Sequence, residues 1–127
     1  GSGYQAAILG EICDSVYSIE VVESLGKKAA LLLDDLGYEN VFVKTGDGYK
    51  GWKEHSPYDA IIVTCAPTEV PRPLIDQLHE GGKMVIPVGE LYAQELLLLT
   101  KKDGEMKQKY LIPVRFVPMK STEGRKY

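Results

Sequence analysis

The first residues of the chain have the composition of a turn that binds a nucleotide-like cofactor. Gly1 and Gly3 flank Ser2 in a glycine-rich turn that runs directly into a helical pattern over residues 4–13. Glycines let a backbone approach a ligand closely, and the first turn of a helix offers N–H groups to it. Glu20 ends the next expected strand, where a carboxylate can accept hydrogen bonds from both ribose hydroxyls. Alone, Glu20 would be interpreted as an ordinary exposed glutamate; with the glycine turn, it predicts a cofactor site.

A second acidic residue, Asp47, lies between Gly46 and Gly48 after a short expected strand over residues 41–43. With a glycine on either side, its carboxylate is open to the amino group of an adenine. The alternative is an ordinary turn, for which this composition is also typical. Because the carboxyl ends of parallel strands meet at one edge of a sheet, we expect the glycine turn, Glu20 and Asp47 to converge there.

The elements that position these residues alternate between helix and strand through residue 88. Strands are expected over 16–21, 41–43, 59–64 and 83–88, and helices over 4–13, 23–36 and 71–78, the last helix being ended by Gly81-Gly82. The runs at 59–64 and 83–88 are continuously apolar, which is typical of strands buried on both faces of a parallel sheet. The pattern predicts an α/β fold with a mostly parallel sheet.

Beyond Gly89 the pattern changes to two consecutive strands, over residues 94–101 and 107–118. The turn at 102–105 that joins them contains Asp-Gly, a strong hairpin signal. Pro113 and Pro118 indicate that the last strand is irregular or lies at an edge of the sheet. The sheet is therefore expected to end in antiparallel strands.

Composition limits the protein's class. The chain has 127 residues and 44% hydrophobic content, which supports one domain over 1–127 with one core. A net charge of −3 gives no electrostatic reason to expect nucleic acid as a partner. The apolar runs are far shorter than the ~20 residues that cross a bilayer, so no membrane partner is expected. The sequence shows no signal peptide, and Cys13 and Cys65 lack CxxC spacing, so we expect a reduced, cytoplasmic protein with core thiols.

Other reactive side chains form no recognisable catalytic group. Cys65 follows the expected strand 59–64, where sites are built, but a nucleophilic thiol needs a nearby base, and a core or edge thiol is favoured. His55 and His79 have no motif around them and are interpreted as surface residues. No cluster has the spacing of metal ligands. The sequence therefore predicts no metal and assigns no catalytic residue.

Along essentially its whole length, the chain resembles the protein-L-isoaspartate (D-aspartate) O-methyltransferase family, which are S-adenosylmethionine-dependent repair enzymes. The resemblance is carried by GSGYQAA at 1–7, VYSIE at 16–20, LGYENV at 36–41, GDGYKGW at 46–52, PYDAIIVTCAP at 57–67, VPRPLIDQLHEGGKMVIPVG at 70–89, QELLL at 94–98 and VRFVPM at 114–119. PYDAIIVT, VP-x-PLI-x-QL and IPVG together are specific to this family among methyltransferases.

The resemblance implies a Rossmann-like methyltransferase fold and places the family's cofactor residues on seven positions. They are Gly1, Ser2 and Gly3 beside the methionine part of the cofactor, Glu20 at the ribose, Asp47 and Gly48 on the adenine side, and Gln94 near the cofactor pocket. The implied reaction moves a methyl group from S-adenosylmethionine to the α-carboxylate of an L-isoaspartyl residue in a damaged protein. That carboxylate is ionised near neutral pH, so the chemistry is positioning rather than base catalysis.

The chain departs from the family at its start. Family members carry an upstream segment that holds the strand leading into the glycine loop and a Thr-Ile-Ser-type motif at the methyl-transfer site. That strand belongs in the middle of the sheet, and each backbone group left buried and unpaired without it costs about 1–3 kcal/mol. We therefore expect a C-terminal portion that lacks the first strand and has little or no turnover alone. Alternatively, the sheet closes differently or a partner supplies the strand.

Two other functional classes compete with this interpretation. One is a non-catalytic fragment with weak cofactor binding or a strand-swapped assembly. The other is a nicotinamide-dependent Rossmann oxidoreductase, which is disfavoured because positions 1, 3 and 6 are Gly, Gly and Ala, an incomplete GxGxxG. The sequence specifies neither the oligomeric state nor the preferred peptide.

Overall fold

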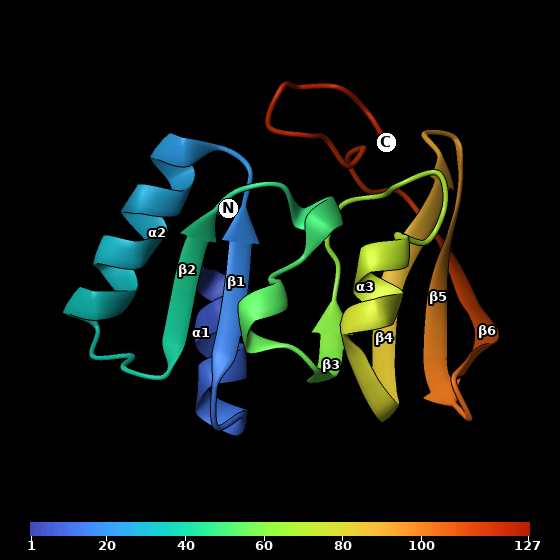
Figure 1. Cartoon of the computed structure of the whole chain (residues 1–127). Helices are drawn as coiled ribbons and strands as arrows, with labels where there is room; N and C mark the ends of the chain where they lie inside the picture. The colour runs from blue at the N-terminus through green and yellow to red at the C-terminus, as the bar shows by residue number, and fades with distance from the viewer. The chain divides into compact units, whose positions relative to one another are not determined.

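A computed structural model describes all residues from Gly1 to Tyr127. The chain forms two compact units, Gly1–Gly48 and Tyr49–Tyr127. Figure 1 shows the helices and strands of each unit. The expectation of a single domain over the whole chain stays a prediction.

The first unit is a parallel strand pair with two helices packed against it. Its elements are α1 (Tyr4–Ile12), β1 (Val16–Glu20), α2 (Glu23–Asp35) and β2 (Val41–Thr45). The strands pair in parallel from Val16 opposite Val41 to Glu20 opposite Thr45. Each element contributes one residue to the buried core, which consists of Ala6, Val16, Leu33 and Val41. Figure 1 shows the N-terminus beside the carboxyl ends of both strands.

Helix α2 ends in a glycine-centred capping motif. Gly37 has φ +82°. Its N–H donates to the Asp34 carbonyl at 3.0 Å, and the Tyr38 N–H donates to the Leu33 carbonyl at 3.0 Å. These two bonds form a Schellman motif, which satisfies helix carbonyls and turns the chain toward β2. The helix predicted over residues 23–36 is confirmed.

The second unit contains a four-stranded mixed sheet. Two 3-10 turns, η1 (Gly48–Lys50) and η2 (Lys53–His55), lead into β3 (Tyr58–Ile62), α3 (Arg72–Gln77), β4 (Leu78–Glu90), β5 (Ala93–Lys102) and β6 (Glu105–Val114). The strand order is β3-β4-β5-β6, with β3 and β4 parallel and the later neighbours antiparallel. The core consists of Leu74, Leu78, Met84, Ile86, Leu97 and Leu99. The α/β class and the antiparallel finish are confirmed.

The strands form two separate sheets. β1 pairs with β2 alone, and β3 pairs with β4 alone. Each of β1 and β3 therefore has one edge without a strand partner in this chain.

Two strand limits were predicted wrongly. β4 begins at Leu78 rather than residue 83, and Gly81-Gly82 lies inside it instead of ending the preceding helix. The register of β4 with β3 is irregular between Tyr58 and Ala60, so the extra residues are absorbed as a bulge in which Gly81 takes φ +81°. β6 ends at Val114 rather than 118, because the following segment leaves β5 and Pro118 bridges to Ala66.

The Asp-Gly hairpin and the edge position of the last strand are confirmed. Asp103 and Gly104 take φ +53° and +75°, the positive values of a type I′ turn. β6 is the outermost strand of its sheet, which tolerates Pro113 because one side of the strand needs no ladder donor. None of the three α-helices has the length and apolar content needed to span a bilayer.

Candidate cofactor site

Glu20 connects the glycine turn to the turn that follows β2. The backbone nitrogen of Gly1 donates a hydrogen bond to Glu20 Oε2. The Glu20 carbonyl accepts the N–H of Gly46 at 3.0 Å. The glycine turn, Glu20 and the start of Gly46-Asp47-Gly48 thus meet at the carboxyl ends of β1 and β2. Their predicted convergence is confirmed.

The Glu20 carboxylate is held in its ionised form. Burial raises its pKa, but the hydrogen bond from the terminal ammonium, the N–H groups of Val22 and Val21, and the ammonium's charge together lower it below the ordinary value of 4.5. The Val22 N–H lies 3.0 Å from Oε1. The side chain retains 17% of its exposure. An ionised carboxylate with about four acceptor positions keeps capacity for further hydroxyl donors.

Gly3 is required by the geometry of the turn. It has φ +85° and precedes α1 as its N-terminal cap residue. A Cβ at this position would lie 3.2 Å from the Ala29 Cβ and 3.3 Å from Leu33 Cδ1. Ser2 lies beside it and accepts the Tyr4 N–H at 3.3 Å through its Oγ. The turn therefore packs tightly against α2, and a side chain here would need Ala29 and Leu33 to shift as well as a backbone conformation that favours glycine.

Asp47 and Gly48 occupy different environments at the end of the first unit. Asp47 is buried, with 8% of its surface exposed. A Cβ placed on Gly48 would meet nothing within 4 Å, so the space beside its backbone is open. Gly48 also begins η1. The Gly48 backbone therefore has open space beside it, whereas the Asp47 side chain is largely covered.

The sequence analysis did not identify Gly26 as a residue that shapes the candidate site. A Cβ on this residue would lie 2.7 Å from Thr45 Oγ1 and 3.6 Å from the Glu20 Cβ. Gly26 therefore lets α2 approach the ends of β1 and β2, where the candidate site lies. A glycine inside an otherwise regular helical pattern, between Leu25 and Lys27, was the available signal.

Gln94 belongs to the second unit, whereas the other six predicted site residues belong to the first. Its side chain is 4% exposed. Its Nε2 donates to the Phe116 carbonyl at 3.0 Å, and its Oε1 accepts the Phe116 N–H at 2.7 Å. The amide thus holds the backbone that follows β6. A role for Gln94 at the cofactor stays a prediction.

Backbone hydrogen bonds fix the segment that follows β3, at Ala66 and Pro67. Ala66 exchanges bonds of 2.8 Å with Val117 and Met119, and the Gly89 N–H donates to the Pro67 carbonyl at 3.0 Å. Cys65 in this segment is half-buried. The expectation of core thiols is wrong, because Cys13 caps the end of α1 and is exposed. Neither cysteine is in a disulfide.

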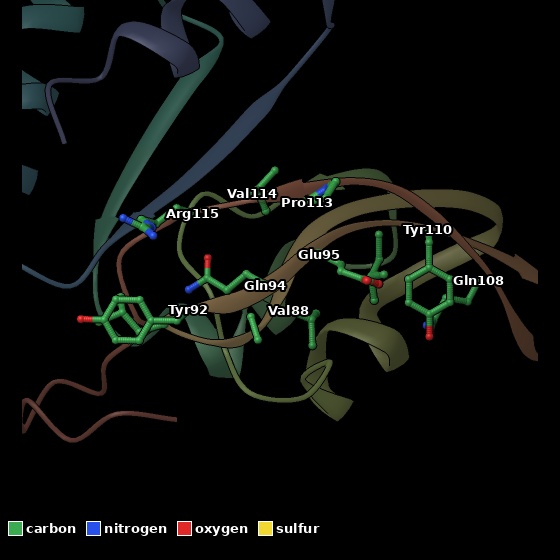
Figure 2. Close-up of a pocket in the computed structure, with 12 residues that line it drawn as sticks. Val88, Tyr92, Gln94, Glu95, Gln108, Tyr110, Pro113, Val114 and Arg115 are labelled. Carbon is green, nitrogen blue, oxygen red and sulfur yellow. The ribbon is translucent and has the colours of Figure 1, made fainter.

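A hollow of about 430 Å³ lies on the strands of the second unit. Figure 2 shows Tyr92, Gln94 and Arg115 at one end of it and Gln108 and Tyr110 at the other. The Arg115 guanidinium carbon lies 5.6 Å from the centre of the Tyr92 ring, a cation–π contact. No sequence motif identified this hollow, because its walls come from separate strands.

Comparison with known proteins agrees with these features. The family model described as protein-L-isoaspartate(D-aspartate) O-methyltransferase matches residues 1–124. Protein-L-isoaspartate O-methyltransferase 2 of Syntrophobacter fumaroxidans is 54% identical over 121 residues, which cover 94% of this chain and 49% of the relative.

Two solved structures are also similar. A protein-L-isoaspartate O-methyltransferase has a TM-score of 0.90 at 35% identity, over 98% of this chain and 41% of its own. A Plasmodium falciparum protein, assigned as a beta-aspartate methyltransferase and in complex with S-adenosyl-L-homocysteine, has a TM-score of 0.73 at 28% identity, over 93% and 58%. This chain spans about half the length of the curated relatives it matches. It belongs to the protein-L-isoaspartate(D-aspartate) O-methyltransferase family and has the Rossmann-like fold of its methyltransferases.

Proposed function

We propose that this chain supplies the cofactor-binding part of an S-adenosylmethionine-dependent enzyme that methylates the α-carboxylate of L-isoaspartyl residues in damaged proteins. The observation that carries the proposal is the position of Glu20, which links the glycine turn at Gly1 to the turn at Gly46. Family membership supports the activity. The S-adenosyl-L-homocysteine bound to the Plasmodium falciparum relative supports the cofactor.

In this proposal each predicted residue meets a different part of the cofactor. Gly1, Ser2 and Gly3 lie beside the methionine part, where a close backbone approach is needed. The ionised Glu20 carboxylate accepts hydrogen bonds from the two ribose hydroxyls, as acids at this position do in nucleotide-binding folds. Asp47 and Gly48 receive the adenine, and Gln94 lies near the pocket. The residues present fit the group, because an acceptor-only acid suits hydroxyl donors.

The proposed methyl transfer does not depend on acid–base catalysis by the protein. When bound, the cofactor supplies an electrophilic methyl group on a sulfonium. The acceptor carboxylate is ionised near neutral pH, so no general base is needed. The residues of this chain act by binding and orienting the cofactor, and orientation alone can account for several kcal/mol of a barrier. No residue of the chain is assigned to the acceptor peptide.

The second candidate is a non-catalytic fragment that retains cofactor binding. It is favoured by the unpaired edges of β1 and β3, which leave the sheet divided. We propose a cytoplasmic location, supported by two cysteines that form no disulfide, since thiols persist in reducing compartments. Isoaspartyl-containing proteins are the proposed partners.

A methyl-transfer assay separates these candidates. The chain alone, and a fusion of the chain behind the amino-terminal half of the Syntrophobacter relative, are given labelled S-adenosylmethionine with an isoaspartyl peptide. The matched aspartyl peptide is the control. We expect label on the isoaspartyl peptide with the fusion and little or none with the chain alone. A folded fusion that binds S-adenosylhomocysteine yet labels neither peptide would refute the proposed substrate.

A further inference from the structure

The side-chain amide of Gln77 is bonded in both directions to the backbone of a distant loop. Gln77 is the last residue of α3 and is 7% exposed. Its Nε2 donates to the Lys50 carbonyl at 2.9 Å, and its Oε1 accepts the Trp52 N–H at 2.9 Å. One amide therefore pairs with residues 50 and 52 as a neighbouring strand would. A buried amide placed this way holds backbone rather than filling apolar space.

Gly51, between those two residues, is shaped to this contact. It has φ +66°, and a Cβ on it would lie 2.2 Å from the Gln77 Oε1. No residue with a side chain fits there unless Gln77 moves. The Tyr58 hydroxyl donates to the Trp52 carbonyl from the other direction. The loop over residues 50–52 is thus held at three backbone atoms.

The end of α3 that carries Gln77 is itself fixed. The ammonium of Lys101 donates to the carbonyls of Ile75 and Leu78, at 3.1 and 3.0 Å. The Ile75 carbonyl also accepts the Leu78 N–H, so Lys101 adds a second hydrogen bond at this end of the helix. Because Ile75 and Leu78 lie on either side of Gln77 in the chain, these bonds fasten the backbone that carries Gln77 to β5.

The held loop is continuous with the predicted adenine-side pair. Asp47 and Gly48 lead through η1, Gly48–Lys50, directly into the residues that Gln77 holds. We propose that Gln77 is a positioning residue for the cofactor: it fixes the loop at 50–52 so that the backbone at Gly48 has one conformation before the adenine binds. This inference rests on the proposed function. Preorganising a loop lowers the ordering cost of binding and so strengthens affinity.

The test combines two substitutions with a matched control. Gln77→Met keeps the side-chain volume and removes both hydrogen bonds, whereas Gln77→Glu keeps an acceptor for the Trp52 N–H. Gln108→Met makes the same chemical change at an exposed position of β6. For each full chain, S-adenosylhomocysteine affinity is measured by calorimetry, and amide exchange at Trp52 by NMR. The emission of Trp52, the single tryptophan, reports on the loop independently.

We expect Gln77→Met to weaken S-adenosylhomocysteine binding about tenfold, the loss expected for about one hydrogen bond. Its Trp52 amide should exchange faster and its Trp52 emission should shift. Gln77→Glu should keep the Trp52 amide protected and lose less affinity, and Gln108→Met should match the wild type. A purely structural role would lower stability toward urea without this graded change in affinity among folded variants.

Two results would overturn the inference, and they are distinguishable. If the wild type binds S-adenosylhomocysteine and Gln77→Met binds it equally well despite a deprotected Trp52 amide, the loop does not act on the cofactor, and the proposed function stands. If the folded wild type does not bind, the proposed function fails for this chain and the inference falls with it. Should Gln77→Met fail to fold, Gly51→Ala strains the same contact from the loop and must weaken binding similarly.

Discussion

Gln94 and Phe116 exchange two hydrogen bonds, of 3.0 and 2.7 Å, between one side-chain amide and one residue's backbone. The bonds fasten the segment after β6 to the start of β5. Val117, next in the chain, accepts the Ala66 N–H at 2.8 Å. The buried amide of Gln94 therefore helps to close the segment that follows β3, whether or not it also meets a cofactor.

Replacing Gln94 with alanine should destabilise the second unit. The change leaves the N–H and carbonyl of Phe116 without their partner, and each buried unpaired group costs about 1–3 kcal/mol. We expect a loss of about 2–4 kcal/mol in the free energy of unfolding, measured with urea. Gln108→Ala, on exposed β6, should change it by less than about 0.5 kcal/mol. Equal stability of the two variants would show that the hydrogen bonds between Gln94 and Phe116 do not stabilise the second unit.

Glu20 should make the protein sensitive to acid. Its folded-state pKa is lowered, so its contribution to stability is fully present above the unfolded value near 4.5. That contribution is lost as pH falls through the lower folded value. Unfolding free energy measured from pH 7 down to pH 3 should therefore fall less in Glu20→Gln than in the wild type.

The control for this titration is Glu23→Gln. Glu23 also has a lowered pKa, through its hydrogen bond and charge interaction with Lys27 at 2.6 Å, but both side chains are exposed. Exposed pairs are screened by salt and contribute little. Raising the salt concentration should erase the Glu23 effect and leave most of the Glu20 effect. An identical acid profile for Glu20→Gln and the wild type would exclude the proposed electrostatic role.

Gly3→Ala and Gly37→Ala separate backbone strain from crowding. Both glycines have similar positive φ, +85° and +82°, but a Cβ on Gly37 meets nothing within 4 Å. The left-handed conformation costs a residue with a Cβ about 1–2 kcal/mol. Gly3→Ala should cost more than Gly37→Ala, because its Cβ also presses on Ala29 and Leu33. Thermal unfolding of both variants checks the difference, and equal costs would show that the turn relaxes away from α2.

Gly26→Ala tests the close approach of α2 to the strand ends. In an open helix interior this change stabilises by about 1 kcal/mol. Here the new Cβ would lie 2.7 Å from Thr45 Oγ1, so we expect destabilisation instead. Adding Thr45→Ala should relieve the clash and restore part of the lost stability. Stabilisation by Gly26→Ala alone would mean that α2 does not lie as close as described.

Much of the fold could be predicted because its signals are local. Gly37 carries the conformation that ends α2, and Asp103-Gly104 carries the hairpin, so each turn is visible within a few residues. The start of β4 at Leu78 could not be predicted this way. Gly81-Gly82 resembles a helix end, and only the pairing of Leu78 with Tyr58 makes the segment a strand.

The residues of the candidate site also differ in whether their signal is local in the sequence. Gly3, Glu20 and Asp47 could be predicted as site residues because a glycine turn and acids at strand ends are recognisable in sequence. Gly26 and Gln77 were missed, since each acts on partners far away in the chain, Thr45 in one case and the loop at 50–52 in the other. Their roles depend on packing that no short motif records.

The most direct test of the account is a calorimetric titration of the 127-residue chain with S-adenosylhomocysteine, with NADH as the competing cofactor class. We expect saturable binding with a dissociation constant on the order of micromolar, at least about tenfold weaker in Glu20→Ala, and no binding of NADH. A folded chain that binds no S-adenosylhomocysteine, or one that binds NADH in its place, would contradict it.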